Sequence, residues 1–477
     1  MIRRILNSIV ESASQPIEPT IFPHPFTKPE TVPFSWLTTR APCFPIKADN
    51  VTILTKPEQF YNILLKHCQY AKDRVTLASL YIGNGDLEKK LVGTLKSNKE
   101  FLANKLKINI LLDYTRGSRY ENNSRTILLP LVQQSNNCTV SLYHTPVLRG
   151  ILKRYTPDRW NELYGLQHMK LYIFDDTLII SGANLSNDYF TNRQDRYIVI
   201  KDKRLSDFYC GLVNRVQKFS LKMNKDNHLS LDSDWKILPY QGNKFEFIEK
   251  SADIIEQYMV ENIQENAHKE EGFDTWMFPM VQMGQLGIEQ DAQITDKILA
   301  DTPPNSRLKI ATGYFNLTNQ FTNTIIRKSK AQCDILMAHP KANGFFGAQG
   351  VAGGIPYAYS LIARTFKENC KKAGQEQRVK LFEYFREGWT YHGKGLWYYP
   401  PNQDTPCVSL IGSPNFGERS VKKDLESQMV IITENETLRD LLHEECRQLF
   451  QQGLPADTNR KGPLWVHTFV LLFKSYF

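Results

Sequence analysis

Short runs of apolar, β-branched and aromatic residues recur along the chain and are separated by mixed polar and apolar stretches. The runs are typical of buried strands. Two of the mixed stretches, 57–72 and 436–451, are typical of helices that bury one face. Strands that alternate with helices predict a layered α/β fold.

The apolar runs occur twice in the same order, at an offset of roughly 225–240 residues. The matched segments are 74–83 with 307–316, 107–113 with 333–338, 140–143 with 379–382, 166–174 with 390–398, 178–186 with 409–417, and 195–200 with 426–432. Two copies of one pattern predict two α/β halves that pack about a pseudo-two-fold axis.

The repeat divides the chain into five parts. We expect an N-terminal extension at 1–50, a first half at 51–225, a helical connector at 226–300, a second half at 301–455 and an apolar tail at 456–477. A chain of 477 residues suggests two to three domains, and the repeat identifies two of them as copies.

The composition is that of a globular protein with a modest basic excess. The formal net charge is +9, and the chain is 41% hydrophobic and 23% charged. This charge favours anionic partners such as nucleic acid, phosphorylated metabolites or acidic lipid, and it does not choose among them. No run of eighteen or more apolar residues occurs, so the sequence predicts no membrane-spanning helix.

Both ends of the chain allow two interpretations. The first residues, MIRRILNSIVESASQ, resemble a short amphipathic transit peptide and equally suit a plain first helix. The last residues, PLWVHTFVLLFKSYF, suit a terminal element that docks on the core, or an anchor in a lipid headgroup layer.

Cysteine and histidine spacing gives no sign of a metal centre. None of the eight cysteines belongs to a CxxC pair, which disfavours a disulfide framework or a zinc ribbon and fits a reducing compartment. No HExxH or Cys/His cluster occurs. We therefore predict no metal site and no cofactor.

The feature that the two copies share best is a set of polar residues. Copy one has His168, Lys170, Asp175, a Ser-Gly-Ala-Asn turn that ends at Asn184, and Asp195. Copy two has His392, Lys394, a Gly-Ser-Pro-Asn turn with Ser413 and Asn415, and Glu426. The spacing from the asparagine to the acid is identical in the two copies. One HxK triplet is weak evidence, but two with matched followers are difficult to attribute to chance.

Residues i and i+2 of an extended segment share a face, so each histidine projects with its lysine. If the halves pack symmetrically, two imidazoles and two ammonium groups meet at one interface. Such a cluster can bind a phosphate and stabilise a pentavalent phosphorus transition state. One histidine can attack phosphorus while the other transfers a proton. Asp195 and Glu426 can each hold a histidine Nδ1–H.

The pattern His168-x-Lys170-x4-Asp175, followed by SGAN and by a partial second copy with GSPN, resembles the phospholipase D superfamily and its duplicated HKD motif. The runs at 79–91, 111–119, 167–197 and 311–318 are similar to the phosphatidylglycerophosphate synthase family within it. The resemblance covers roughly residues 50–450. It implies two phospholipase D-like α/β/α sandwich halves with one active site at their interface.

The resemblance also implies a reaction and a place. The family transfers a phosphatidyl group from CDP-diacylglycerol to glycerol 3-phosphate, releasing CMP. In eukaryotes it belongs to mitochondria, so we expect a peripheral protein of the inner membrane that contacts anionic lipid. The oligomeric state stays open.

Carried over by motif, His168 is the nucleophile and His392 is the acid toward CMP and the base on the glycerol hydroxyl. Lys170 and Lys394 hold phosphate oxygens with the help of the two asparagines. Asp175 completes the first motif, whereas the second copy has Tyr399 at that position, with Asp404 as a weak substitute. The serine contact is doubtful in copy one, where the turn begins Ser-Gly.

Cations beyond the motif are expected to bind the anionic substrates. The leading candidates are Arg116, Arg119, Arg193 and Arg196, because they follow predicted strands near the motifs. Arg149, Arg386 and Arg419 rank after them.

Three other functions remain open at this level. A nucleic-acid phosphodiesterase uses the same two histidines, but the cations do not alternate with aromatic residues as in a single-strand track, so we expect no nucleic-acid partner. A hydrolase, or a phosphatidyltransferase with serine or phosphatidylglycerol as acceptor (a phosphatidylserine or cardiolipin synthase), differs only in a few pocket residues. A non-catalytic scaffold is disfavoured by the complete first motif.

Overall fold

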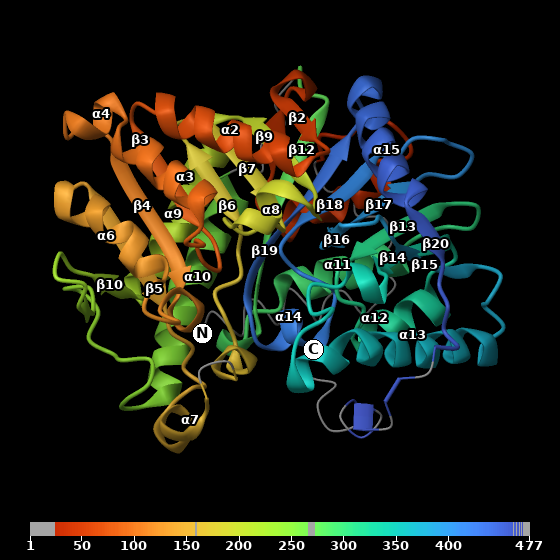
Figure 1. Cartoon of the computed structure of the whole chain (residues 1–477). Coiled ribbons are helices and arrows are strands. Elements are labelled where there is room, and N and C mark those ends of the chain that lie inside the picture. The colour runs from red at the N-terminus through yellow and green to blue at the C-terminus, as the bar shows by residue number, and fades with distance from the viewer. Residues whose placement is uncertain are drawn as a thin grey trace.

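The computed structural model describes residues 24–157, 160–265, 272–460, 462, 463, 465, 466, 468 and 470. Most of them belong to two nine-stranded sheets and the helices around them. Figure 1 shows the first half of the chain, in red to yellow, beside the second half, in green to blue. The layered α/β fold predicted from the apolar runs is confirmed.

The first sheet is built almost entirely from the first half. Its strands, in spatial order, are β11 (Leu229–Ser230), β10 (Leu221–Met223), β5 (Cys138–Tyr143), β4 (Lys107–Asp113), β3 (Arg74–Ala78), β6 (Leu171–Phe174), β7 (Thr177–Ser181), β9 (Tyr197–Lys201) and β2 (Val51–Leu54). Strands β3, β4 and β5 run parallel to one another, and every other pairing is antiparallel.

The second sheet repeats this arrangement. Its strands, in spatial order, are β1 (Phe44–Ile46), β12 (Thr275–Met283), β19 (Leu425–Thr433), β18 (Val408–Gly412), β17 (Gly395–Tyr399), β13 (Arg307–Thr312), β14 (Gln332–Ala338), β15 (Val379–Tyr384) and β20 (Gly453–Pro455). The central order β19-β18-β17-β13-β14-β15 matches β9-β7-β6-β3-β4-β5 strand for strand, with the same parallel and antiparallel pairings. The two halves are therefore copies of one unit.

Helices cover the sheets and bury one face each. The main ones are α2 (Pro57–Tyr70), α3 (Asp86–Lys96), α6 (Ser124–Gln134), α9 (Lys203–Lys218), α10 (Lys244–Glu265), α11 (Gln290–Ala300), α13 (Ile355–Lys372) and α15 (Glu436–Gln451). Helices α2 and α15 occupy the stretches predicted to be helical. One apolar core runs through both halves, since Leu171 and Ile198 of the first sheet belong to the same buried cluster as Trp397 and Ile431 of the second. This shared core fixes the two sheets relative to each other.

The prediction of a helical connector at 226–300 is wrong in part. The segment contains α10 and α11, but between them strand β12 is buried along its whole length and pairs with β19. Pro279 lies in this strand, and proline normally marks an edge or an interruption of a sheet. Strand β1 pairs only with 275–277, so beyond Met277 that side of β12 has no strand partner in the described chain, and a residue without an N–H is tolerated.

The N-terminal extension is also part of the second sheet. Strand β1 crosses to the second half and adds to the outer side of β12. Before it, Thr31 and the backbone N–H of Thr27 donate hydrogen bonds to Glu434, at the end of β19. The stretch 24–46 therefore packs with the second half, although the first half follows it in sequence.

The two chain ends bear on localisation. The predicted targeting segment lies outside the described residues, as does half of the predicted tail at 456–477. Of the tail, Val466 is buried and Trp465 is partly exposed. Within the described residues, no helix combines the length and apolar character needed to cross a bilayer.

Candidate active site

Two short extended segments place the histidines at the seam between the halves. The segment before β6 runs beside the start of β19, where the N–H of His168 donates to the carbonyl of Leu425 at 2.8 Å. In the same way, the N–H of His392 donates to the carbonyl of Gln194, also at 2.8 Å. Leu425 and Gln194 each stand one residue before an acid of the motif. The backbone therefore brings each histidine next to the acid of the other half.

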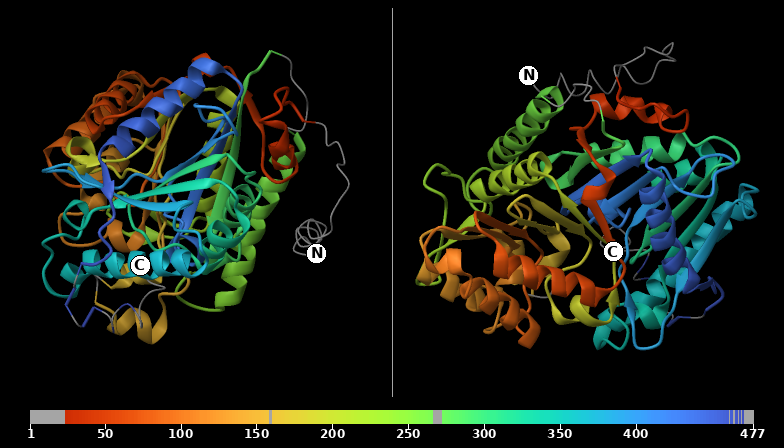
Figure 2. Two further views of the ribbon diagram at one scale, coloured as in Figure 1. Left: turned by 90° about the vertical axis from the view of Figure 1, so that its right-hand side faces the viewer. Right: turned by 90° about the horizontal axis from the view of Figure 1, so that it is seen from above.

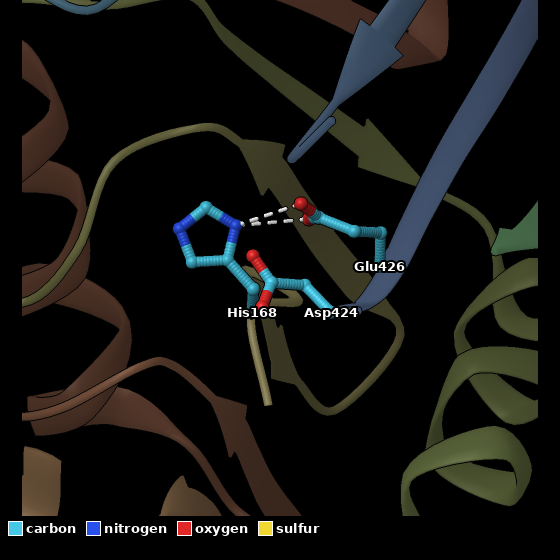
Figure 3. Close-up of side chains that lie close together, drawn as sticks. All are labelled: His168, Asp424 and Glu426. Carbon is cyan, nitrogen blue, oxygen red and sulfur yellow. Dashed lines mark hydrogen bonds and ion pairs between the residues drawn. The ribbon is translucent and has the colours of Figure 1, made fainter. Parts of the chain in front are cut away.

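The side chains complete this crossed arrangement. Nδ1 of His168 donates to both carboxylate oxygens of Glu426, at 2.9 and 3.0 Å (Figure 3). Nδ1 of His392 donates to Asp195 Oδ2 at 2.6 Å. A histidine that gives its Nδ1 proton to a carboxylate leaves Nε2 unprotonated, as a nucleophile or base requires.

Each lysine of the site bonds to the backbone of the histidine in its own motif. Nζ of Lys170 donates to the carbonyl of His168 at 2.6 Å, and Nζ of Lys394 donates to the carbonyl of His392 at 2.8 Å. Both side chains are buried, and burial lowers the pKa of Lys170 to about 7 and that of Lys394 to about 8. An anion that binds between them restores their positive charge, so the pair is suited to a phosphate.

Burial also sets the protonation of the other four groups. It lowers the pKa of His168 and His392 well below the usual value, with a further contribution from the neighbouring lysines, so both rings are neutral. Burial raises the pKa of Glu426 to about 7 and that of Asp195 to about 6. The site thus combines two neutral imidazoles with two buried lysines and two buried carboxyl groups.

The asparagine turns border the histidines. Nδ2 of Asn184 donates to the hydroxyl of Tyr189 at 3.1 Å, and the backbone N–H of Asn415 donates to Ser420. The Oδ1 atoms of both asparagines are buried without a hydrogen-bond partner among the described residues. Ser413 bonds to the backbone of Ser427 at the second turn.

The first turn has no such serine, for a steric reason. A Cβ on Gly182, the residue equivalent to Ser413, stands 2.7 Å from Asp195 Oδ1 and 3.0 Å from Lys394 Cδ. The neighbouring Ser181 hydroxyl donates to the carbonyl of Arg196 and holds the turn, so it does not face the site.

Comparisons with known proteins agree with this geometry. Residues 64–215 match a family model described as cardiolipin synthase, PLD-like domain. The chain is 41% identical over 93% of its length to the mitochondrial CDP-diacylglycerol–glycerol-3-phosphate 3-phosphatidyltransferases of Gallus gallus and Homo sapiens, covering 86% of each. The chain belongs to this family of phosphatidyltransferases. The crystal structure of phosphatidylserine synthase from Haemophilus influenzae shares the fold, with a TM-score of 0.67 at 19% identity over 91% of this chain and 95% of that one.

The resemblance to the phospholipase D superfamily and the two-half fold are thereby confirmed. One residue of the first motif nevertheless lies apart from the chemistry. Asp175 stands at the turn between β6 and β7 with φ of +51°, and its carboxylate accepts the backbone N–H groups of Lys72, Asp73 and Arg74. Its carboxylate therefore ties this turn to the start of β3, and the catalytic role of Asp175 stays a prediction.

The second copy stabilises the equivalent turn differently. Tyr399 pairs with Arg307 across β17 and β13, and its hydroxyl contacts His443. Asp404 forms an exposed ion pair with Arg307, the residue equivalent to Arg74. Asp404 thus neutralises an arginine and accepts none of the backbone groups that Asp175 accepts.

Arg196 is likewise a structural residue. It is buried, forms two bonds with Glu445, stacks on Trp397 and donates to the carbonyl of Leu410. These partners occupy its guanidinium and join β9 to the second half. These contacts disfavour the predicted role of Arg196 in substrate binding, which stays a prediction.

The other three arginines lie near the site and keep some freedom. Arg116 and Arg119 share the carboxylate of Glu162, at 3.7 and 2.6 Å. Arg193 stacks on Tyr189 and donates to Asp188. All three side chains are partly exposed, so a substrate anion can replace or join their present acidic partners.

Three residues near the site, Tyr81, Tyr314 and Asp424, escaped sequence reasoning. Tyr81 and Tyr314 occupy equivalent positions of the repeat, and in each case a hydroxyl side chain two residues earlier donates to the tyrosine carbonyl. Asp424 stands two residues before Glu426, and Arg193 two residues before Asp195. A residue-by-residue alignment of the two copies would have indicated all three, because it matches the two tyrosines and sets Asp424 opposite Arg193.

Asp424 completes the only group of described side chains close enough to hold a metal ion, with His168 and Glu426 (Figure 3). Its two oxygens accept the N–H of Leu166 and Nε of Arg419, each at 3.0 Å. Glu426 is occupied by the His168 ring. Asp424 is thus occupied by a backbone N–H and an arginine, and Glu426 by the ring that it orients.

Proposed function

We propose that this chain transfers the phosphatidyl group of CDP-diacylglycerol to glycerol 3-phosphate through a covalent intermediate on His168. Relatives that are 41% identical over 93% of the chain carry the name of this reaction. The observation that carries the mechanism is the state of His168. Its Nδ1 is held by Glu426, and among the described residues nothing bonds to its Nε2.

In the first step, Nε2 of His168 attacks the phosphorus of the phosphatidyl group while the bond to the CMP oxygen breaks. Lys170 and Lys394 hold the non-bridging oxygens, where negative charge builds up. The phosphorylated imidazole is cationic, and Glu426 balances its charge. CMP leaves as an anion and needs little help from an acid, so the acid role of His392 is the minor one.

In the second step, the acceptor hydroxyl attacks the same phosphorus and the bond to His168 Nε2 breaks. The hydroxyl proton goes to His392, whose neutral ring is suited to this role because Asp195 stabilises the imidazolium that forms. The proton is then lost to solvent. Both histidines return to their starting state, with Nε2 unprotonated.

Exposure supports His168 as the nucleophile. The side chain of His168 is 13% exposed and that of His392 is 4% exposed. An attacking nitrogen must reach the phosphorus of a large lipid, whereas a base needs to reach only a small alcohol.

Acceptor choice is assigned to Arg116, Arg119 and Arg193. The acceptor differs from serine or water by a phosphate dianion, and guanidinium groups bind such a group in two-point fashion. Glu162 now occupies the space between Arg116 and Arg119, as an anion would. Arg116→Met is expected to raise the KM for glycerol 3-phosphate with little change in the rate of CMP release.

One assay tests the function as a whole. The protein is incubated with labelled CDP-diacylglycerol and, separately, with water, glycerol 3-phosphate, serine or phosphatidylglycerol. We expect transfer to glycerol 3-phosphate alone. Transfer to serine, or hydrolysis without transfer, would overturn the proposal.

We also assign the chain to the mitochondrion, as a peripheral protein of the inner membrane that binds anionic lipid. The names of the vertebrate relatives include mitochondrial. Helix α7 (Gly150–Tyr155) has no buried residue; Ile151 and Tyr155 are 77% and 71% exposed, beside the exposed Arg154. It lies at the same end of the molecule as the last described residues (Figures 1 and 2). Apolar side chains beside cations suit an acidic lipid surface.

Binding to vesicles tests this assignment. Replacing both Ile151 and Leu152 by Ser is expected to lower cosedimentation with vesicles that contain acidic lipid, and deletion of 463–477 is expected to lower it further. Leu102→Ser serves as the control, because Leu102 is exposed on another helix (α4, Lys99–Leu102). Equal binding by all three variants would refute this surface.

A further inference from the structure

One tyrosine contacts the reactive nitrogen of the proposed base. Tyr189, on the short helix α8 (Asn187–Thr191), is buried, and its hydroxyl lies 3.3 Å from Nε2 of His392. Nζ of Lys394 lies 2.7 Å from Nδ1 and 3.1 Å from Nε2 of the same ring, and an atom this close to both nitrogens stands over the ring face. Since His392 gives its other ring proton to Asp195, Nε2 carries a lone pair in the ring plane, and the tyrosine hydroxyl is the donor to it. Asn184 donates to the same hydroxyl oxygen at 3.1 Å. Protons therefore point in one direction, from Asn184 through Tyr189 and His392 to Asp195.

The position of the tyrosine ring is fixed from two sides. It stands edge-on to the His392 ring, with centroids 5.1 Å apart and an interplanar angle of 82°. The guanidinium of Arg193 covers the ring at 4.7 Å from its centroid. Arg193 is itself held by Asp188 and Thr390, so the ring has little freedom to turn away.

The second half has no counterpart. Tyr189 is six residues before Asp195, and the residue six before Glu426 is Ser420. The hydroxyl of Ser420 accepts the N–H of Asn415, and no described side chain bonds to Nε2 of His168. The tyrosine therefore serves one histidine only, the one to which we assign proton transfer.

This contact poses a problem for the second step of the proposed reaction. His392 must take a proton at Nε2, but the lone pair of Nε2 is already engaged by the hydroxyl of Tyr189. Either the tyrosine leaves, or the proton passes through it. The packing of its ring favours passage.

We propose that Tyr189 is a catalytic residue that relays the acceptor's proton to His392; this rests on the proposed function. As the acceptor oxygen forms its bond to phosphorus, its proton moves to the oxygen of Tyr189. The tyrosine's own proton moves to Nε2 of His392 in the same step, and the bond from phosphorus to His168 breaks. Tyr189 begins and ends protonated, and Arg193 stabilises negative charge that develops on its oxygen during the transfer.

The variant Tyr189→Phe separates the two steps. It keeps the ring and removes the hydroxyl. In a rapid-quench experiment with excess CDP-diacylglycerol, the burst of CMP release is expected to keep its amplitude, because the first step does not use the relay. Transfer to glycerol 3-phosphate is expected to fall ~10²-fold, with accumulation of the lipid–protein adduct. Tyr143→Phe is the matched control, since Tyr143 is a buried tyrosine whose hydroxyl lacks a partner among the described residues.

A second readout distinguishes a relay from packing. In mixtures of H₂O and D₂O, the transfer step of the unmodified protein is expected to depend on the deuterium fraction in a curved manner, since two protons move together. A linear dependence would overturn the relay. Transfer by Tyr189→Phe at or above the unmodified rate would also overturn it, because the hydroxyl would then be only a cap. Absence of the CMP burst from the unmodified protein would instead refute the covalent route itself.

Discussion

The two halves carry the same histidine and lysine on equivalent segments, just before β6 and β17, yet the surroundings of the two histidines differ. His168 is held by Glu426, with Asp424 two residues earlier, and its Nε2 is bare. His392 is held by Asp195, with Arg193 two residues earlier, and its Nε2 is covered by Tyr189. Burial lowers the pKa of both rings; Asp424 opposes this shift at His168, whereas Arg193 adds to it at His392.

Under the proposed mechanism, this difference explains how a duplicated site divides two roles. The backbone that presents each histidine is unchanged between the copies, as the matched bonds to Leu425 and Gln194 show. Exchange of a few neighbours is enough to leave one imidazole open to a phosphorus atom and to connect the other to a proton path. Four predictions test whether the two histidines really differ.

The largest effect is expected from the histidines themselves. His168→Ala should abolish both CMP release and transfer, by ~10⁴-fold or more, because the nucleophile is lost. His392→Ala should still release CMP once and should retain the lipid on the protein. Mass spectrometry after an alkaline quench detects the adduct. An adduct on His168→Ala but not on His392→Ala would reverse the assignment.

The next largest effect concerns the crossed acids. Glu426→Gln should slow the first step and Asp195→Asn the second, each by ~10²–10⁴-fold, because the histidine loses the carboxylate that fixes its tautomer. Rapid-quench kinetics measures the two steps separately. Equal damage to both steps by either change would show that the two halves do not divide the work.

A moderate effect is expected from pH. The carboxylates must be ionised, and burial raises their pKa to about 6 for Asp195 and about 7 for Glu426, so kcat/KM should fall as pH decreases through this range. The lysines must be protonated, and burial lowers their pKa to about 7 and about 8, so kcat/KM should also fall as pH rises through these values. The plot of kcat/KM against pH is therefore expected to be a narrow bell-shaped curve. An acid limb below about pH 5 would contradict burial of the acids.

The smallest effect on catalysis is expected at Asp175. Asp175→Ala removes the acceptor of three backbone N–H groups and should lower the free energy of unfolding by about 1–3 kcal/mol. Activity per folded molecule at 20 °C should stay near normal, in contrast to the histidine variants. Thermal unfolding and active-site titration by CMP burst measure the two quantities. A large loss of burst rate in folded protein would show that Asp175 contributes to the reaction itself.

Sequence reasoning reached the parts of the structure that depend on local pattern. The apolar runs and the helices at 57–70 and 436–451 follow from periodicity, and the shared polar set marked both histidines and both acids. It failed where the answer depends on pairing between distant segments. Strand β12 contains a proline, which is acceptable only because β1 is short. Arg196 and Arg193 lie in the same run, and only the tertiary structure shows that Glu445 occupies the first of them.

A position in a family motif does not by itself indicate whether a residue serves catalysis or folding. Asp175 belongs to the motif by position, but its contacts are with the backbone at the start of β3. Tyr189 belongs to no motif, although it touches the proposed base. In both cases, the side chain's partners determine its role, and neither set of partners has a signature in one sequence.

The crossed pairs have a consequence for the protein's synthesis. His168 and its acid are 258 residues apart in the chain, so a ribosome that has made the first half has produced a histidine with no carboxylate to orient it. A truncated or half-translocated chain therefore holds no assembled reaction centre. Lipid chemistry begins only after nearly the whole polypeptide has been made and its two halves have come together.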